Sequence, residues 1–417
     1  MHANRKGPTP VEILTAACIA LATALWSTLE YVLRGPRLPA WDLRLQLQRD
    51  IGHALITRAL PPPTDDTALA TLDVFALAAS LQRMTPPPKP LPATQGTHCA
   101  VSIATKHVPL DTAGLRNAGV ASDRLLALVA SDMGAPGAGR MLHGEIVVAR
   151  RTAALLEPHA HAGHTALLQC APLYAAEPLV LYFHGGGYVV GDAAAYRHVL
   201  CRLSDVCRAR VLAIDYRLAP HHAFPAQLHD ALVAYAHVLA QGFASHQIVV
   251  AGDSAGGHLA TTLALLLRSA AMPPPAALVL LSPYSNLVET KPSVAANSRY
   301  DSIVMLPLES PAAYARMLYA PAQPLTPAMR KEMRDPLVSP VFADFTAFPP
   351  VLVQAGAREI LIDDIEQLVA AIAASNPDAV VYEPYADMIH VFQAFFDRPE
   401  NAVAFASIGR FVSQFWR

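Results

Sequence analysis

The chain has 417 residues, of which 53% are hydrophobic and 15% are charged, and its formal net charge is −2. This length exceeds most single hydrophobic cores and suits a core with an additional cap. A nearly neutral chain without a basic patch and interleaved aromatic residues argues against a nucleic-acid partner. The cysteines number five and show no C-x-x-C spacing, which argues against both a disulfide framework and a zinc knuckle.

The first element is an apolar segment, residues 13–29, which carries no charge over 17 positions. Arg5 and Lys6 precede it. Because about 20 residues usually span a bilayer, the segment is at the short limit for a membrane helix. Three interpretations stay open: a single-pass or signal-anchor helix, a signal peptide cleaved near Ala22 or Ala24, and a cap helix whose apolar face covers the mouth of a site.

Residues 1–140 contain few motifs, and proline clusters at 61–63 and 86–92 mark loops or linkers in them. We expect this N-terminal helical region to form part of a cap, joined by an insertion at about 287–335. Residues 141–417 carry the motifs and form the main domain. Within the insertion, four apolar side chains would either line a substrate pocket or pack against the core; they are Tyr314, Met317, Leu318 and Tyr319.

Short apolar runs alternate with helical patterns through the main domain. This alternation is typical of an α/β fold with a doubly wound, mostly parallel sheet. The expected strands lie near residues 146, 166, 179, 211, 248, 277, 351 and 380, and the expected helices near 192, 226, 255, 362 and 400.

A serine between glycines follows the strand at 248–251, in the sequence Gly-Asp-Ser-Ala-Gly-Gly at 252–257. A sharp strand-to-helix turn requires residues with no side chain beside the serine, so that its hydroxyl stays exposed. The pattern therefore predicts that Ser254 is a nucleophile. The alternative is an ordinary glycine-rich turn capped by serine.

A second glycine motif, His-Gly-Gly-Gly at 184–187, follows the strand at 179–183. Such a loop brings backbone N–H groups against a reacting carbonyl, which a side chain would block. We expect an oxyanion hole from Gly185, Gly186 and Gly187, in which Gly185 shapes the loop, together with the amide of Ala255.

A nucleophilic serine needs a base and an acid, in the order Ser, Asp/Glu, His along the chain. His390 follows the last expected strand, and Glu359 lies at the carboxyl end of the strand at 351–354, where catalytic groups gather in open α/β sheets. Asp363 and Asp364 follow one helical turn later and compete for the role of the acid. We expect Glu359 to fill it.

Three histidines, at positions 159, 161 and 164, could hold a transition metal. No carboxylate or cysteine completes the set, so a solvated hairpin loop between two strands is the favoured interpretation. We expect no metal and no organic cofactor.

The motifs together resemble the hormone-sensitive lipase branch of the α/β-hydrolases, and within it the fungal steryl-deacetylase-like esterases. The match covers roughly residues 145–417, whereas the first 140 residues resemble the family only loosely. The matching motifs are HGGGY at 184–188, DYRLAP at 215–220, FPA at 224–226, GDSAGG at 252–257, LSPYSN at 281–286 and DPLVSP at 335–340.

The resemblance implies an α/β-hydrolase domain with a helical cap and a triad of Ser254, Glu359 and His390. It implies hydrolysis of carboxylic esters with small or medium acyl groups, acetyl among them, on an apolar alcohol. Amidase, thioesterase or lactonase activity is the alternative, followed by non-catalytic ligand binding. It also implies membrane association through the N-terminal helix, at the endoplasmic reticulum or another membrane; a cytoplasmic location is the alternative. It further implies a homodimer formed through an edge strand or the final helix.

The sequence departs from the family's usual pattern in three places. Glu359 stands in a stretch one residue longer than the usual G-x-D-P-L, as in fungal-type members. His221 replaces the usual glutamate after DYRLAP, and Asp387 replaces the usual glycine three residues before the base. We expect Asp387 to be a loop residue.

Overall fold

The computed structural model describes residues 10–38, scattered positions between 41 and 90, and residues 91–104, 140–160, 163–301, 318–319, 326–395 and 398–416. The described chain forms one eight-stranded sheet in the order β1-β2-β4-β3-β5-β6-β7-β8. Its strands are β1 (Gly96–Ala104), β2 (Met141–Ala149), β3 (Leu179–Phe183), β4 (Arg210–Asp215), β5 (Ile248–Asp253), β6 (Ala277–Leu281), β7 (Val351–Gly356) and β8 (Val380–Tyr385).

β1 and β2 run antiparallel to their neighbours, and β4, β3, β5, β6, β7 and β8 run parallel. The predicted α/β fold with a mostly parallel sheet is therefore confirmed. β1 was not predicted from the sequence. Since β1 belongs to the sheet, the sheet begins within the segment assigned to the N-terminal helical region, ahead of the expected boundary at residue 140.

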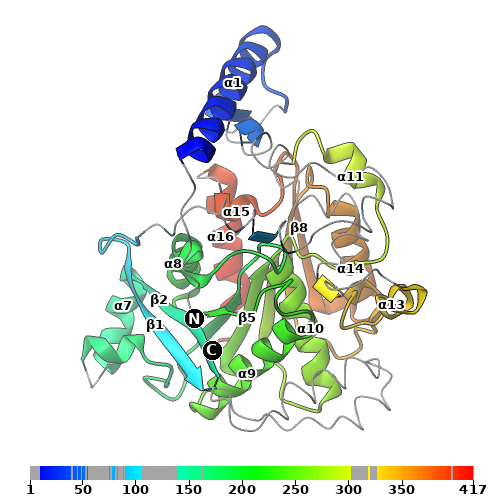
Figure 1. The fold of residues 1–417 in the computed structure, drawn as a ribbon. Helices are drawn as coiled ribbons and strands as arrows, with labels where there is room; N and C mark the ends of the chain where they lie inside the picture. Colours follow the sequence, from blue (N-terminus) through cyan, green and yellow to red (C-terminus); the bar gives the residue numbers. More distant parts are fainter. Residues whose placement is uncertain are drawn as a thin grey trace.

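Helices cover both faces of the sheet (Figure 1). On one face, α8 (Arg197–Cys207) and α16 (Pro399–Val412) pack against alternate strand residues such as Val180 and Val249. On the other, α9 (Ala226–Ala240), α10 (Ala255–Ser269) and α14 (Ile362–Ser375) pack against the intervening residues, such as Leu181 and Val250. Both faces of the central strands are buried, which explains their continuous apolar runs.

The strand expected near residue 166 is wrong. The apolar run there forms the 3-10 helix η2 (His164–Leu168), because both edges of the neighbouring β2 are already paired with β1 and β4. The buried guanidinium of Arg210 holds the chain after η2 through the carbonyls of Gln169 and Ala171.

The expected hairpin at the three histidines is also wrong, since η2 is not a strand. The segment instead contains α7 (Arg150–Leu156) and η1 (Glu157–His159) before η2. His161 lies outside the described residues.

Two short helices belong to the expected cap insertion, α11 (Pro292–Asn297) and α13 (Pro327–Glu332). Leu318 and Tyr319 are buried in the main core cluster, which favours packing over pocket lining for these two residues. Tyr314 and Met317 lie outside the described residues.

The N-terminal helix α1 (Pro10–Arg34) projects from the body of the molecule (Figure 1). Ser27 is the one buried residue between positions 15 and 34. This exposure does not fit a cap helix that buries an apolar face on the rest of the chain.

Candidate active site

The parallel strands end at a common edge of the sheet, and each motif follows one of these ends. The His-Gly-Gly-Gly loop follows β3, Ser254 follows β5, Glu359 follows β7, and His390 follows β8. The topology therefore gathers residues that are far apart in the sequence at the carboxyl edge of the sheet, where open α/β sheets bind their ligands.

Ser254 lies in a strained turn between β5 and α10, with φ 51° and ψ −117°. Two glycines permit this turn. A Cβ atom on Gly256 would lie 1.9 Å from the carbonyl oxygen of Phe183, and one on Gly252 would lie 2.4 Å from the carbonyl oxygen of Gly256. The turn thus presses α10 against β3 and presents the serine hydroxyl, as the glycine pattern predicts.

A continuous hydrogen-bond chain joins the three residues predicted as the triad. His390 Nε2 lies 2.9 Å from Ser254 Oγ, and His390 Nδ1 lies 2.5 Å from Glu359 Oε2. Both His390 and Glu359 are buried. The geometry is that of a nucleophile, a base and an orienting acid.

Asp363, the competing acid, lies in the first turn of α14, and its Oδ2 accepts a hydrogen bond from the backbone N–H of Ser293 at 2.8 Å. Asp364 Oδ1 accepts one from Asn286 Nδ2 at 2.9 Å. Only Glu359 among the three is hydrogen-bonded to His390. Its second oxygen accepts from the N–H of Gly356 at 2.9 Å, which orients the carboxylate.

Burial and charge shift the pKa values of the buried pair. Burial raises the pKa of the Glu359 carboxyl, although its hydrogen bond to His390 opposes this. Burial lowers the pKa of the His390 imidazole, but the hydrogen bond and charge of Glu359, with the charges of Asp301 and Asp253, outweigh burial and raise this pKa above its ordinary value of 6.5. The imidazole is thus a stronger base than a free histidine, as proton abstraction from a serine requires.

Asp253, which precedes the nucleophile, links the elbow to the glycine loop. Its carboxylate accepts hydrogen bonds from the N–H of Gly185 at 2.8 Å and from the hydroxyls of Tyr182 at 2.6 Å and Tyr196 at 3.0 Å. Burial raises its pKa. Sequence reasoning missed this role, although the aspartate stands inside the elbow motif.

The glycine loop adopts backbone angles that favour glycine, with φ 104° at Gly186 and 61° at Gly187. The amide of Gly185 is occupied by Asp253. Gly185 therefore shapes the loop, and the amides of Gly186, Gly187 and Ala255 are the candidate donors to an oxyanion. His184 stacks on Tyr216 with ring centroids 4.3 Å apart, which supports the start of the loop.

Asp387 is a loop residue, as expected from its position. Its carbonyl accepts a hydrogen bond from Trp41 Nε1 at 2.9 Å. The ring of His221 lies 5.6 Å from that of Phe75, at the surface. Within the described part of the chain, no three His, Cys, Asp or Glu side chains gather as a metal site.

Comparison with known proteins shows the family. A family model described as the alpha/beta hydrolase fold matches residues 180–394. An acetyl-hydrolase of Streptomyces hygroscopicus is 34% identical over 235 residues, which cover 56% of this chain and 74% of the relative. An esterase of Acinetobacter venetianus is 31% identical over 242 residues, covering 57% of this chain and 75% of the relative.

Among solved structures, an esterase from the bacterial hormone-sensitive lipase family is 26% identical with a TM-score of 0.59, covering 89% of this chain and 98% of the other. The predicted resemblance to the hormone-sensitive lipase type is confirmed. The relatives named above are bacterial or of bacterial type, and the narrower likeness to fungal steryl-deacetylase-like esterases stays a prediction. With the strained elbow, the glycine loop and the matched family model, the chain belongs to the alpha/beta hydrolase fold family.

Proposed function

We propose that this chain hydrolyses carboxylic esters through an acyl-enzyme intermediate on Ser254. The observation that carries the proposal is the unbroken chain of hydrogen bonds from Ser254 Oγ through His390 to Glu359 Oε2. The relatives named as an acetyl-hydrolase and an esterase support ester hydrolysis. An intact set of three groups argues against a purely ligand-binding member of the fold.

The mechanism follows from these positions. His390 Nε2 accepts the proton of the Ser254 hydroxyl as the oxygen attacks the ester carbonyl, and Glu359 stabilises the imidazolium and its tautomer. The amides of Gly186, Gly187 and Ala255 would donate to the developing oxyanion. His390 then protonates the leaving alcohol. A water molecule, deprotonated by His390, then attacks the acyl-enzyme, and its collapse releases the acid and returns the proton to Ser254.

We propose small or medium acyl groups as the substrates, acetyl among them, on an apolar alcohol. The relative named as an acetyl-hydrolase supports this choice. Amides, thioesters and lactones react through the same triad and are the alternative. A series of p-nitrophenyl esters from acetate to decanoate, measured beside the matching anilides and thioesters, separates these classes through kcat/KM.

Active-site labelling tests the proposed nucleophile directly. A fluorophosphonate should add to Ser254 in a one-to-one ratio, because the buried base activates this hydroxyl. Intact mass and peptide mapping measure the adduct, and an excess of p-nitrophenyl butyrate should slow its formation. An adduct on another serine, or none, contradicts the assignment.

We further propose that α1 binds a lipid bilayer. Thr15–Arg34 is long and apolar enough to cross a membrane, by length and composition. Its large apolar side chains are exposed by 49 to 72%; they are Leu21, Leu25, Trp26, Leu29, Val32 and Leu33. Apolar surface of this kind gains about 25 cal/mol per Å² when it leaves water, and Arg34 ends the helix with a charge suited to anionic headgroups.

Vesicle flotation tests this second proposal. The full chain should float with vesicles of phosphatidylcholine and phosphatidylserine, whereas a variant with Leu25→Ser, Leu29→Ser and Leu33→Ser should stay in solution with kcat/KM on p-nitrophenyl acetate within about twofold. The substitutions leave Glu30, which pairs with Arg37, untouched. Lipid binding is contradicted if the full chain does not float with the vesicles. It is also contradicted if the full chain forms a dimer without lipid and the variant does not, because the apolar face would then bind a second copy. The mass of the mature chain shows whether a peptide is cleaved near Ala22 or Ala24.

A further inference from the structure

A second buried carboxylate lies beside the turn that carries the triad acid. Asp301, which is fully buried, accepts a hydrogen bond at Oδ2 from the backbone N–H of Ile360 at 2.9 Å. Ile360 directly follows Glu359. No motif in the sequence points to Asp301, which is separated from Ile360 by 59 positions.

The segment that ends at Asp301 encloses the same turn with further hydrogen bonds. Asn297 Nδ2 donates to the carbonyl of Glu359 at 2.9 Å, and Ser293 Oγ donates to the carbonyl of Ile360 at 2.7 Å. Together with Asp301, these contacts hold both carbonyls and one N–H of the turn. The backbone position of Glu359 is therefore set by residues 293–301.

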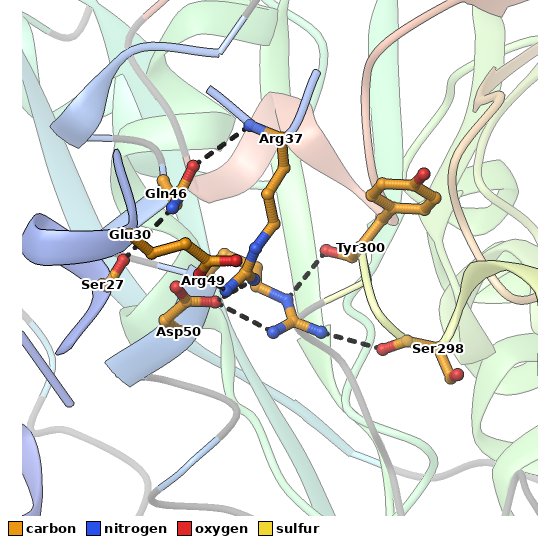
Figure 2. Close-up of polar contacts among 8 residues, drawn as sticks. All are labelled: Ser27, Glu30, Arg37, Gln46, Arg49, Asp50, Ser298 and Tyr300. Carbon is orange, nitrogen blue, oxygen red and sulfur yellow. Dashed lines mark hydrogen bonds and ion pairs between the residues drawn. The ribbon is translucent and has the colours of Figure 1, made fainter. Parts of the chain in front are cut away.

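The N-terminal segment holds residues 298–300 in turn (Figure 2). The buried guanidinium of Arg49 donates from Nε to the carbonyl of Tyr300 at 3.1 Å and from Nη2 to the carbonyl of Ser298 at 2.8 Å. Asp50 Oδ1 accepts from Arg49 Nη1 at 2.9 Å and from Arg37 Nη1 at 2.6 Å. This ion-pair network fixes the guanidinium in place, since its fork of donors is rigid.

The same N-terminal segment also contacts the loop of the base. Trp41 donates to the carbonyl of Asp387 and packs edge-on against Tyr300, with ring centroids 6.5 Å apart. It shares a buried cluster with Met388 and Ile389, the two residues before His390. Trp41 and Arg49 thus contact the loop of the base and the segment that encloses the turn of the acid.

We propose that Asp301 is a positioning residue for the triad. Asp301 fixes the turn of Glu359 and stabilises the positive charge that His390 acquires, and Arg49 holds the segment of Asp301 in place. The inference rests on the proposed function of Ser254, Glu359 and His390.

The charges around the base support this role. The charge of Asp301 raises the pKa of His390, beside the larger effect of Glu359 and with that of Asp253. The same charge raises the pKa of Glu359. Two cationic groups lie near the segment of Asp301. They are Arg49, whose pKa burial lowers although the charge of Asp301 opposes this, and Arg358, whose guanidinium lies 5.5 Å from the centroid of the Tyr300 ring.

The sign of the expected effect follows from the chemistry. His390 must be neutral to accept the serine proton, so kcat/KM falls as the pH falls through the pKa of His390. Asp301→Asn removes the charge and keeps an oxygen that can accept from Ile360. The pKa of His390 then drops, and the acid limb of the kcat/KM profile moves to lower pH by about 0.5–1 unit.

The experiment measures kcat/KM for p-nitrophenyl butyrate from pH 4.5 to 9 in wild type, Asp301→Asn and the control Asp364→Asn. Asp364 is a buried carboxylate on the adjacent helix whose partner is Asn286. The rate of fluorophosphonate labelling is measured over the same pH range, so that the titration of His390 is followed without an ester substrate. We expect the shift in Asp301→Asn in both measurements and an unmoved acid limb in Asp364→Asn.

An acid limb that stays in place in Asp301→Asn, with any loss of activity matched by a loss of Tm, overturns the proposal and leaves Asp301 a structural residue. Failure of the proposed function looks different, because wild type itself would then show neither turnover nor labelling.

Arg49→Lys tests the proposed role of Arg49 in holding the segment of Asp301. We expect kcat to fall roughly tenfold with KM within about twofold, because a lysine cannot hold both carbonyls; unchanged kcat overturns the role of Arg49.

Discussion

Ser254→Ala should lower kcat for p-nitrophenyl acetate and butyrate by about a millionfold, to the residual rate that an oxyanion hole and binding alone support. The hydroxyl is the atom that forms the acyl-enzyme, and His390 Nε2 lies 2.9 Å from it. No other group in this geometry takes over its role. KM should change little, because the hydroxyl contributes mainly after the substrate is bound.

The measurement is steady-state hydrolysis of both esters, with circular dichroism and Tm to verify the fold. Ser269→Ala is the matched control. Ser269 lies at the end of the same helix α10, and its hydroxyl bonds to the carbonyl of Leu265 at 2.9 Å. We expect the control to keep wild-type turnover. Turnover in Ser254→Ala above about 1% of wild type contradicts the assignment of the nucleophile.

Glu359→Gln should lower kcat by roughly ten-thousandfold, because an amide neither holds the required imidazole tautomer nor stabilises the imidazolium. Asp363→Asn should change kcat by less than about threefold. Its Oδ2 accepts from the N–H of Ser293, and the amide oxygen of asparagine can accept the same bond. The two variants therefore separate Glu359 from Asp363, one of the two later carboxylates that compete with it in the sequence.

Both variants are measured across the pH profile and compared with wild type on its alkaline plateau, and their stabilities are compared by Tm. The Gln variant should melt within a few degrees of wild type, because burial already disfavours the charged form of Glu359. A large loss of activity in Asp363→Asn together with an active Glu359→Gln reverses the assignment of the acid.

The elements that the sequence predicts well depend on interactions between near neighbours. The elbow at 252–257 and the loop at 184–187 are recognisable because glycine is required where backbones approach closely. The required glycines stand within a few consecutive residues of each motif. The buried central strands appear as apolar runs for a similar local reason.

Local patterns are insufficient where the pairing of strands decides which element forms. The run at 166–168 is apolar enough for a strand, yet both edges of the neighbouring β2 are already paired. β1 forms from a segment of mixed polarity because β2 offers it an edge.

The sequence by itself determined the fold class, and it predicts the nucleophile and the order of the proposed catalytic groups, since these follow from local turn chemistry and from the order in which motifs occur along the chain. Only the tertiary structure decided which of three nearby carboxylates meets His390. Glu359, in the turn before α14, bonds to His390, whereas Asp363 and Asp364, in the first turn of α14, bond to Ser293 and Asn286. The tertiary structure alone also brought Asp253 to the glycine loop and Asp301 to the acid turn. Such contacts join residues that are far apart in the chain, and the packing of strands and helices, which no local pattern encodes, sets the distance between them.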